Sequence, residues 1–311
     1  MDYGFSTWPA LGIKSSMIDE IVDSSIEHET VKRGGNNTCK IVTYNGKQYA
    51  VLKTSNIEFY NASSPALINK GKSPEEIMES ESLSFINVME ATNRLTRNNA
   101  IPIVGFTYDR DNVAKYGEGE HACAYARGFI VQPKAPGEEL FGGIGYVSSE
   151  NTQKIEMLLQ YTKRYSSITP SQFAQFVSNY YEISKELKID PSKRSNFFYD
   201  EVKGFSFIDL NFLRNEHHSD ERLRAEALEY VALQFRATSE SVFETLTDEQ
   251  KDEYIKSNVK IYKSMAQGFL EAGYSKEEVA SVFDSRLQSD LIISHSGLKN
   301  TTDLIEAEKV Q

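Results

Sequence analysis

The stretch Asp190-Pro-Ser-Lys-Arg-Ser-Asn196 is followed, thirteen residues after its last member, by a second acidic residue, Asp209. Two apolar runs, 197–199 and 205–208, lie between them and enclose a predicted tight turn. We expect a loop that leads into a β-hairpin, with Asp190 and Asn196 before the first strand and Asp209 at the end of the second. Such a hairpin brings the oxygen-bearing side chains of Asp190, Asn196 and Asp209 to its open end. Phosphoryl transfer from a nucleotide needs such a set, because one carboxylate orients the attacking hydroxyl while an amide and a second carboxylate hold magnesium.

The composition is that of a globular protein of 311 residues, long enough for one large or two modest domains. The net charge of −11 argues against nucleic acid as a partner, since that affinity comes from clustered Lys and Arg. Two cysteines are too few for a disulfide framework. No apolar run approaches the roughly 18 residues of a membrane span, and the first residues lack the pattern of a signal peptide. We expect a cytoplasmic protein, which is compatible with signal-independent export into a host cell.

The first part of the chain predicts mainly β-structure. A short amphipathic helix is expected near 17–25. Asn45-Gly46 separates two β-rich runs, 38–44 and 47–53, and this is a strong hairpin signal because a type I′ turn needs positive φ at both central positions. Ser73-Pro74 has the pattern of a helix N-terminus, and the helix is expected to run to about residue 97. Two further strands are predicted over 101–108 and 122–132.

The second part of the chain predicts mainly helices. The sequence Pro133-Lys-Ala-Pro-Gly137 breaks the strand pattern and is the best candidate for a connection between lobes. Helices are predicted over 150–163, 170–186, 220–238, 247–272 and 275–287, with a polar, frayed tail from 294. The fold class predicted is therefore α+β with two lobes. The boundaries we expect are a lead-in at 1–29, a small lobe at 30–132, a hinge at 133–137, a helical large lobe at 138–293 and a tail at 294–311.

Five short motifs, taken in chain order, resemble those of the protein-kinase-like superfamily. Ala50-Val51-Leu52-Lys53 resembles the strand motif whose lysine contacts the α- and β-phosphates, and Gly34-Gly35-Asn36-Asn37 resembles a degenerate glycine-rich loop. The run 130–140 is similar to the last small-lobe strand, the hinge and the turn that follows. Asp190–Asn196 resembles the catalytic loop, and 207–210 resembles the metal-binding motif. The resemblance covers roughly residues 30–215 and implies a bilobal kinase fold.

The resemblance also implies how a nucleotide would bind. ATP would lie under Gly34, Gly35 and Asn36, against the hinge residues Gln132 and Ala135. Lys53 would contact its phosphates. Read from the residues alone, the two glycines fit an ordinary turn equally well, and Lys53 could be a solvated lysine at a strand end.

A carboxylate on the 74–97 helix is the expected partner of Lys53. Glu81 shares a helical stripe with Met78, Phe85 and Val88, which would turn it inwards. Glu79 is nearly as well placed, and periodicity alone leaves this choice open.

For catalysis, the resemblance assigns Mg²⁺ to Asn196 and Asp209, the acceptor hydroxyl to Asp190, and the transferred phosphoryl group to Lys193. Read from the residues alone, Asp190 also suits the start of a turn, because Asp-Pro favours turn initiation. Lys193 and its neighbour Arg194 could equally be surface charges. An aspartate inside an otherwise apolar strand is harder to explain without a function, since burying an unpaired carboxylate is costly.

The chain departs from the kinase pattern in several places. Lys188-Ile189 stands where His-Arg is expected, the spacing from Asp190 to Asn196 is one residue longer than usual, and Leu210-Asn211 replaces Phe-Gly. No long activation segment and no Ala-Pro-Glu motif follow. Similar losses occur in bacterial effector kinases and in small-molecule kinases of the aminoglycoside and choline type. Phosphorylation-gated activation is therefore not expected.

The function expected is an ATP- and magnesium-dependent phosphotransferase, with Ser/Thr hydroxyls of a protein as acceptors because Lys193 resembles the Ser/Thr type of loop. The alternatives are a small-molecule kinase, a pseudokinase or scaffold that binds nucleotide without turnover, and transfer of a nucleotidyl group. The adjacent pair His217-His218 is interpreted as solvent-exposed, because neighbouring positions on a helix do not share a face.

Overall fold

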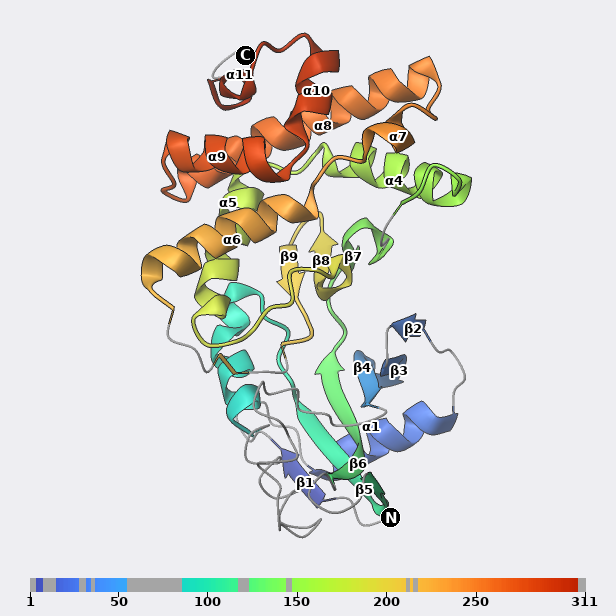
Figure 1. Cartoon of the computed structure of the whole chain (residues 1–311). Helices are drawn as coiled ribbons and strands as arrows, with labels where there is room; N and C mark the ends of the chain where they lie inside the picture. Colours follow the sequence, from blue (N-terminus) through green and yellow to red (C-terminus); the bar gives the residue numbers. More distant parts are fainter. Residues whose placement is uncertain are drawn as a thin grey trace. The chain divides into compact units, whose positions relative to one another are not determined.

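The computed structural model describes residues 4–7, 15–27, 32–34, 37–54, 86–116, 123–143, 147–210, 213–214 and 218–306. The chain forms two compact units, Met1–Lys134 and Ala135–Gln311. The first holds an antiparallel sheet and the second is mostly helical, so the predicted α+β class is confirmed (Figure 1).

The sheet of the first unit has the strand order β1-β5-β6-β4-β3-β2, and every pair is antiparallel. Its strands are β1 (Gly4–Thr7), β2 (Lys32–Gly34), β3 (Asn37–Tyr44), β4 (Lys47–Thr54), β5 (Gly105–Tyr116) and β6 (Cys123–Pro133). The hairpin predicted at Asn45-Gly46 is confirmed, because both residues have positive φ, 49° and 76°, between β3 and β4. Strand β4 also pairs with β6, so it lies between β3 and β6.

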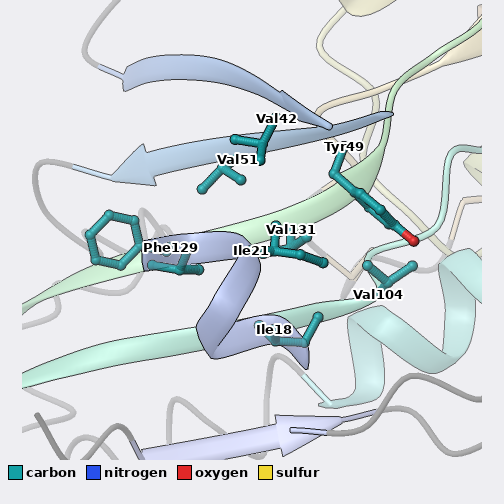
Figure 2. Close-up of a cluster of buried hydrophobic side chains, with 9 residues drawn as sticks. Ile18, Ile21, Val42, Tyr49, Val51, Val104, Phe129 and Val131 are labelled. Atoms are coloured by element: carbon teal, nitrogen blue, oxygen red, sulfur yellow. The ribbon is translucent and has the colours of Figure 1, made fainter. Parts of the chain in front are cut away.

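Helix α1 (Ser15–Glu27) covers one face of this sheet. It buries Ile18, Ile21 and Val22 completely, against apolar residues that alternate along the strands (Figure 2). The sheet residues of this cluster are Val42, Tyr49, Val51, Val104, Phe129 and Val131. Residues 4–7 and 15–27 of the predicted lead-in are therefore part of the first unit's fold.

The first unit differs from the prediction in several elements: strands β1 and β2 were not predicted, and one predicted strand and one predicted helix have other bounds. The strand expected over 101–108 begins only at Gly105 and continues to Tyr116, with an irregular register between Asp109 and Ala114. Of the helix expected over 74–97, residues 86–94 are helical and Leu95–Asn98 form a 3₁₀ turn. Its earlier part lies outside the described residues.

The second unit packs helices around a small three-stranded sheet (Figure 1). The sheet consists of β7 (Glu138–Glu139), β8 (Phe197–Asp200) and β9 (Gly204–Phe207). The main helices are α4 (Thr152–Tyr165), α5 (Pro170–Ser184), α6 (Asp220–Gln234), α8 (Asp248–Glu271) and α9 (Lys276–Arg286), with a short α7 (Glu240–Phe243). Each of the five predicted helices is present, and the observed ends differ by up to a few residues.

Stacked aromatic rings join helix α5 to the small sheet. The rings of Phe176 and Phe205 are stacked with centroids 4.0 Å apart, and Phe197 and Phe207 pack around them. The four are almost completely buried. Since Phe197 and Phe207 are the ends of β8 and β9 nearest the predicted site, this core fixes the position of the site's backbone.

Two short helices, α10 (Ser289–Ser296) and α11 (Thr301–Glu306), lie within residues 289–306, where a frayed tail was predicted from 294. Leu304 is 1% exposed and Ile292 is fully buried. With Ile305, these are the buried apolar side chains of the two short helices, both of which contact α8 and α9. The composition alone did not reveal this packing.

Candidate active site

The predicted β-hairpin is confirmed and supports the site. β8 and β9 pair from Phe197↔Phe207 to Asp200↔Gly204. The carboxylate of Asp200 closes the turn by accepting hydrogen bonds from the backbone N–H groups of Val202 and Lys203, at 2.9 and 2.8 Å. The open end of this hairpin carries Asn196 immediately before β8 and Asp209 two residues after β9.

Asp190 lies in the loop between α5 and β8 and organises that loop itself. Its Oδ1 accepts hydrogen bonds from the backbone N–H of Ser192 at 3.0 Å and from the Ser192 hydroxyl at 2.6 Å. The Nζ of Lys193 is 3.7 Å from Oδ2. Partial burial by itself would raise the pKa of Asp190, but the bonds from Ser192 and the charge of Lys193 outweigh it and lower the pKa below its ordinary value. The carboxylate is therefore ionised at neutral pH and also starts a turn.

Asn196 connects the loop to the end of strand β9. Its side chain is buried, and its Nδ2 donates to the carbonyl of Asp190 at 3.3 Å. Its own carbonyl accepts the backbone N–H of Ile208 at 3.0 Å. One residue thus holds both Asp190 and the residue that precedes Asp209.

Asp209 has an unusual backbone conformation. Its φ is 60°, in the left-handed region that is uncommon for residues other than glycine, although asparagine and aspartate adopt it more often than most. Leu210, the next residue, is fully buried and fixes the chain beyond it. Burial raises the pKa of Asp209; the positive charge of Lys193 opposes this and the negative charge of Asp190 adds to it. The structure therefore brings Asp190, Lys193, Asn196 and Asp209 together in the second unit.

The donor set fits magnesium. Mg²⁺ takes hard oxygen ligands, commonly one or two from protein, with phosphate and water completing the octahedron. A cation beside Asp209 would relieve the cost of burying its carboxylate, which is the cause of its raised pKa. Within the described ranges, no group of three or more His, Cys, Asp or Glu side chains is arranged to hold a metal ion.

In the first unit, strand pairing brings two of the predicted nucleotide-binding positions to one end of the sheet. Lys53 on β4 pairs with Thr38, and Gly34 at the end of β2 pairs with Asn37. Thr38 and Asn37 are consecutive residues at the start of β3, so Gly34 and Lys53 flank the same end of that strand. Gly35, Asn36, Glu79 and Glu81 lie outside the described residues.

The two predicted hinge residues are both buried. Gln132 on β6 is 4% exposed, and its Nε2 donates to the carbonyl of Ile101 at 3.2 Å, within the first unit. Ala135 begins the second unit and is 6% exposed. The side chain of Gln132 thus has a structural partner inside its own unit.

The loop from Asp190 to Asn196 is supported by two side chains whose role the sequence did not predict. The amide of Gln234, at the end of α6, donates to the carbonyl of Pro191 at 3.0 Å. The guanidinium of Arg194 lies over the ring of Phe141, 4.4 Å from its centroid, and burial lowers its pKa. Neither has a local signal in the sequence, because both partners are distant along the chain.

The interpretation of His218 as solvent-exposed is wrong. Its side chain is 8% exposed, and Nδ1 lies 3.2 Å from Oε1 of Glu226 and 2.6 Å from Nη1 of Arg214. It precedes α6 instead of lying within a helix, so the argument from helical faces did not apply. His217 lies outside the described residues.

Comparison with known proteins gives matches at the level of structure only. No protein-family model matches the chain, and no curated protein sequence does. Among solved structures, one match is WaaP in complex with acyl carrier protein, at 12% identity and a TM-score of 0.34, covering 85% of this chain and 92% of that one. An apo pseudokinase matches at 11% identity and a TM-score of 0.31, covering 92% and 90%.

A third match is the amicoumacin kinase hAmiN in complex with AMP-PNP, Ca²⁺ and its ligand, at 13% identity and a TM-score of 0.32, covering 92% of this chain and 96% of that one. The matches include kinase-like proteins. No helix among the described residues has the length and apolar character needed to cross a membrane.

Proposed function

We propose that this protein is an ATP- and magnesium-dependent phosphotransferase that transfers the γ-phosphoryl group to a hydroxyl, with Ser/Thr side chains of a protein as acceptors. The observation that carries the proposal is the partly buried, left-handed Asp209 beside Asn196, Asp190 and Lys193. A conformation of this kind, at a carboxylate that is costly to bury, is typical of functional sites.

The roles follow from the state of each group. Asp190 is ionised and lies at the surface of the loop, so it can accept a hydrogen bond from the acceptor hydroxyl and aim its oxygen at the γ-phosphorus. As that oxygen bonds to phosphorus, the bond from phosphorus to the β–γ bridging oxygen breaks, ADP leaves, and the hydroxyl proton passes to Asp190. Lys193, 3.7 Å from Asp190, is placed to offset the charge on the transferred group.

Asn196 and Asp209 are the residues proposed to hold magnesium, which when bound neutralises phosphate charge. Their part is positioning: Asn196 keeps the carbonyl of Asp190 and the N–H of Ile208 in fixed places, so the two carboxylates cannot move independently. From the first unit, Lys53 and Gly34 to Asn36 are proposed to bind the nucleotide phosphates, with Glu81 as the partner of Lys53 and Gln132 and Ala135 beside the base. These assignments rest on the motif resemblance.

The experiment that tests the proposal has two steps. A thermal shift with ATP and Mg²⁺ reports binding, and incubation with γ-labelled and α-labelled ATP reports which group is transferred. Label from γ-ATP alone, on added Ser/Thr protein or on this chain, supports the proposal. Binding without transfer would instead identify a pseudokinase, and label from α-ATP a nucleotidyl transferase. Transfer only to small alcohols would change the acceptor class and leave the site assignment intact.

A further inference from the structure

Leu213 and Arg214, which follow Asp209 in the chain, are held by contacts that have no part in the proposed chemistry. Leu213 forms an isolated bridge with Leu187, and the backbone N–H of Arg214 donates to the carbonyl of Glu186 at 2.8 Å. These bonds tie the segment that follows Asp209 to the segment that leads into Asp190.

Side chains then lock this segment to helix α6. Nη2 of Arg214 lies 3.5 Å from Oε2 of Glu226, and Nδ1 of His218 lies 3.2 Å from Oε1 of the same carboxylate. Arg222 adds an Nε contact to Oε1 at 3.0 Å. We call Arg214, His218, Arg222 and Glu226 the Glu226 cluster. Glu226 is its only carboxylate and contacts each of the other three members.

Three of the four members of the cluster are largely shielded from solvent, whereas Arg222 is 63% exposed. The side chains of Arg214, His218 and Glu226 are 13%, 8% and 18% exposed. An exposed ion pair contributes little to stability, but removing one partner of a buried pair leaves an uncompensated charge and is strongly destabilising. The Nε of Arg214 is already a buried donor without a partner in the described part of the chain, so this guanidinium depends on Glu226 for its compensation.

The cluster matters because Asp209 has a backbone conformation that must be imposed from outside. A left-handed aspartate persists only where its surroundings determine it more strongly than its own preference does. Before Asp209, the constraint is the hydrogen bond from the backbone N–H of Ile208 to the carbonyl of Asn196. After Asp209, the constraints are the burial of Leu210 and the backbone contacts of Leu213 and Arg214. Glu226 holds the side chain of Arg214.

We propose that Glu226 is a positioning residue, which anchors the segment after Asp209 and so keeps Asp209 in the conformation that binds the metal ion. The inference rests on the proposed function for its catalytic meaning, but its structural part stands independently of that function.

The test compares Glu226→Gln with Glu229→Gln. Glu229 lies on the same helix and pairs with Arg286 at 2.9 Å, but at positions 40% and 50% exposed, so it is a matched control for the loss of one ion-paired carboxylate. The first measurement is the affinity for Mn²⁺ in the presence of AMP-PNP, read from a paramagnetic signal. We expect Glu226→Gln to weaken Mn²⁺ binding by up to about 10-fold, the lower end of the loss seen when a direct partner of a metal ligand is removed, because Glu226 acts on Asp209 through the backbone. Glu229→Gln should leave the affinity unchanged.

The second measurement is hydrogen exchange of the amides from Ile208 to Leu210 in the metal-free protein. Faster exchange in Glu226→Gln, but not in Glu229→Gln, supports the positioning role. Unchanged exchange and unchanged Mn²⁺ affinity in a folded Glu226→Gln would overturn it, even if the melting temperature fell. Wild-type protein that binds neither nucleotide nor Mn²⁺ would refute the proposed function instead, while the exchange data would still decide the positioning role.

Should Glu226→Gln not fold, Arg214→Lys gives the milder variant, since it keeps the charge and loses the forked geometry. It is expected to weaken Mn²⁺ binding by a smaller factor and to raise the same exchange rates. An Arg214→Lys protein identical to wild type in both measurements would also contradict the proposal.

Discussion

At the scale of single residues, Asp209 combines two costs that a purely structural residue would not carry. It occupies a left-handed conformation, and its carboxylate is partly removed from water. Both costs make sense if a cation is bound there, because the cation compensates the charge and the fixed backbone aims it.

The first prediction is that Asp209→Asn is inactive but more stable than wild type. Asparagine keeps the shape and tolerates the left-handed region, so the backbone is preserved. The substitution removes the carboxylate charge proposed to hold the metal ion, so it should lower the rate of phosphoryl transfer by about 10²–10³-fold. Since the folded-state pKa of Asp209 is raised, its contribution to stability is present below the ordinary aspartate pKa and is lost as pH rises through the raised value.

The stabilisation of Asp209→Asn should therefore be visible at pH 8 and absent near pH 3. Chemical denaturation of metal-free protein at several pH values measures it. A variant with wild-type stability at every pH would show that the burial of this carboxylate has no energetic consequence.

At the scale of elements, helices α5 and α8 approach each other unusually closely at Gly268. A Cβ built there would lie 2.6 Å from Cβ of Phe173 and would also overlap the carbonyl of Pro170. Glycine is therefore required by the packing, although it weakens an isolated helix by about 1 kcal/mol relative to alanine.

The second prediction is that Gly268→Ala destabilises the protein by about 1–3 kcal/mol, because the overlap outweighs the gain in helix propensity. Lys260→Ala, at an exposed position of α8, is the control and should change stability little. Urea denaturation compares the two. Increased stability of Gly268→Ala would mean that the two helices separate at little cost.

The third prediction concerns the C-terminal helix α11. Leu304 is 1% exposed, so Leu304→Ala should cost about 2–4 kcal/mol if this helix is packed as described. Thr302→Ala, at an exposed position of the same helix, should cost far less. The midpoint of thermal unfolding distinguishes them. Equal midpoints for the two variants would show that α11 is not packed on the second unit, as the composition of this segment suggests.

At the scale of the whole molecule, the residues proposed for ATP belong to both units. Lys53 is in Met1–Lys134, whereas Asn196 and Asp209 are in Ala135–Gln311. A nucleotide bound as proposed needs groups from each.

The fourth prediction is that Lys53→Met and Asp209→Asn each abolish the increase in melting temperature that ATP and Mg²⁺ cause, because phosphate charge is then left uncompensated. Lys40→Met, on the neighbouring strand β3, is the control and should keep the full increase. Differential scanning fluorimetry measures all three. A Lys53→Met protein with an undiminished shift would remove the first unit's lysine from the nucleotide site.

The sequence by itself determined the local elements and the loop of the site. Asn45-Gly46 specified its hairpin because type I′ geometry is a local requirement, and two short apolar runs on either side of a predicted turn specified β8 and β9. Asp190, Asn196 and Asp209 could be found because they lie within twenty residues of each other, at the ends of those strands. The roles of Lys53, Gly34 and Glu81 came from the resemblance and stay predictions.

Only the tertiary structure decided what holds those residues in place. The left-handed backbone of Asp209, the burial of His218 and the carboxylate of Glu226 have no local signal, since each depends on partners from other elements. The same holds for α11, whose two buried side chains matter only because α8 and α9 provide a surface for them. Burial is a property of the packed chain, and a polar stretch of sequence does not reveal which of its residues another element will cover.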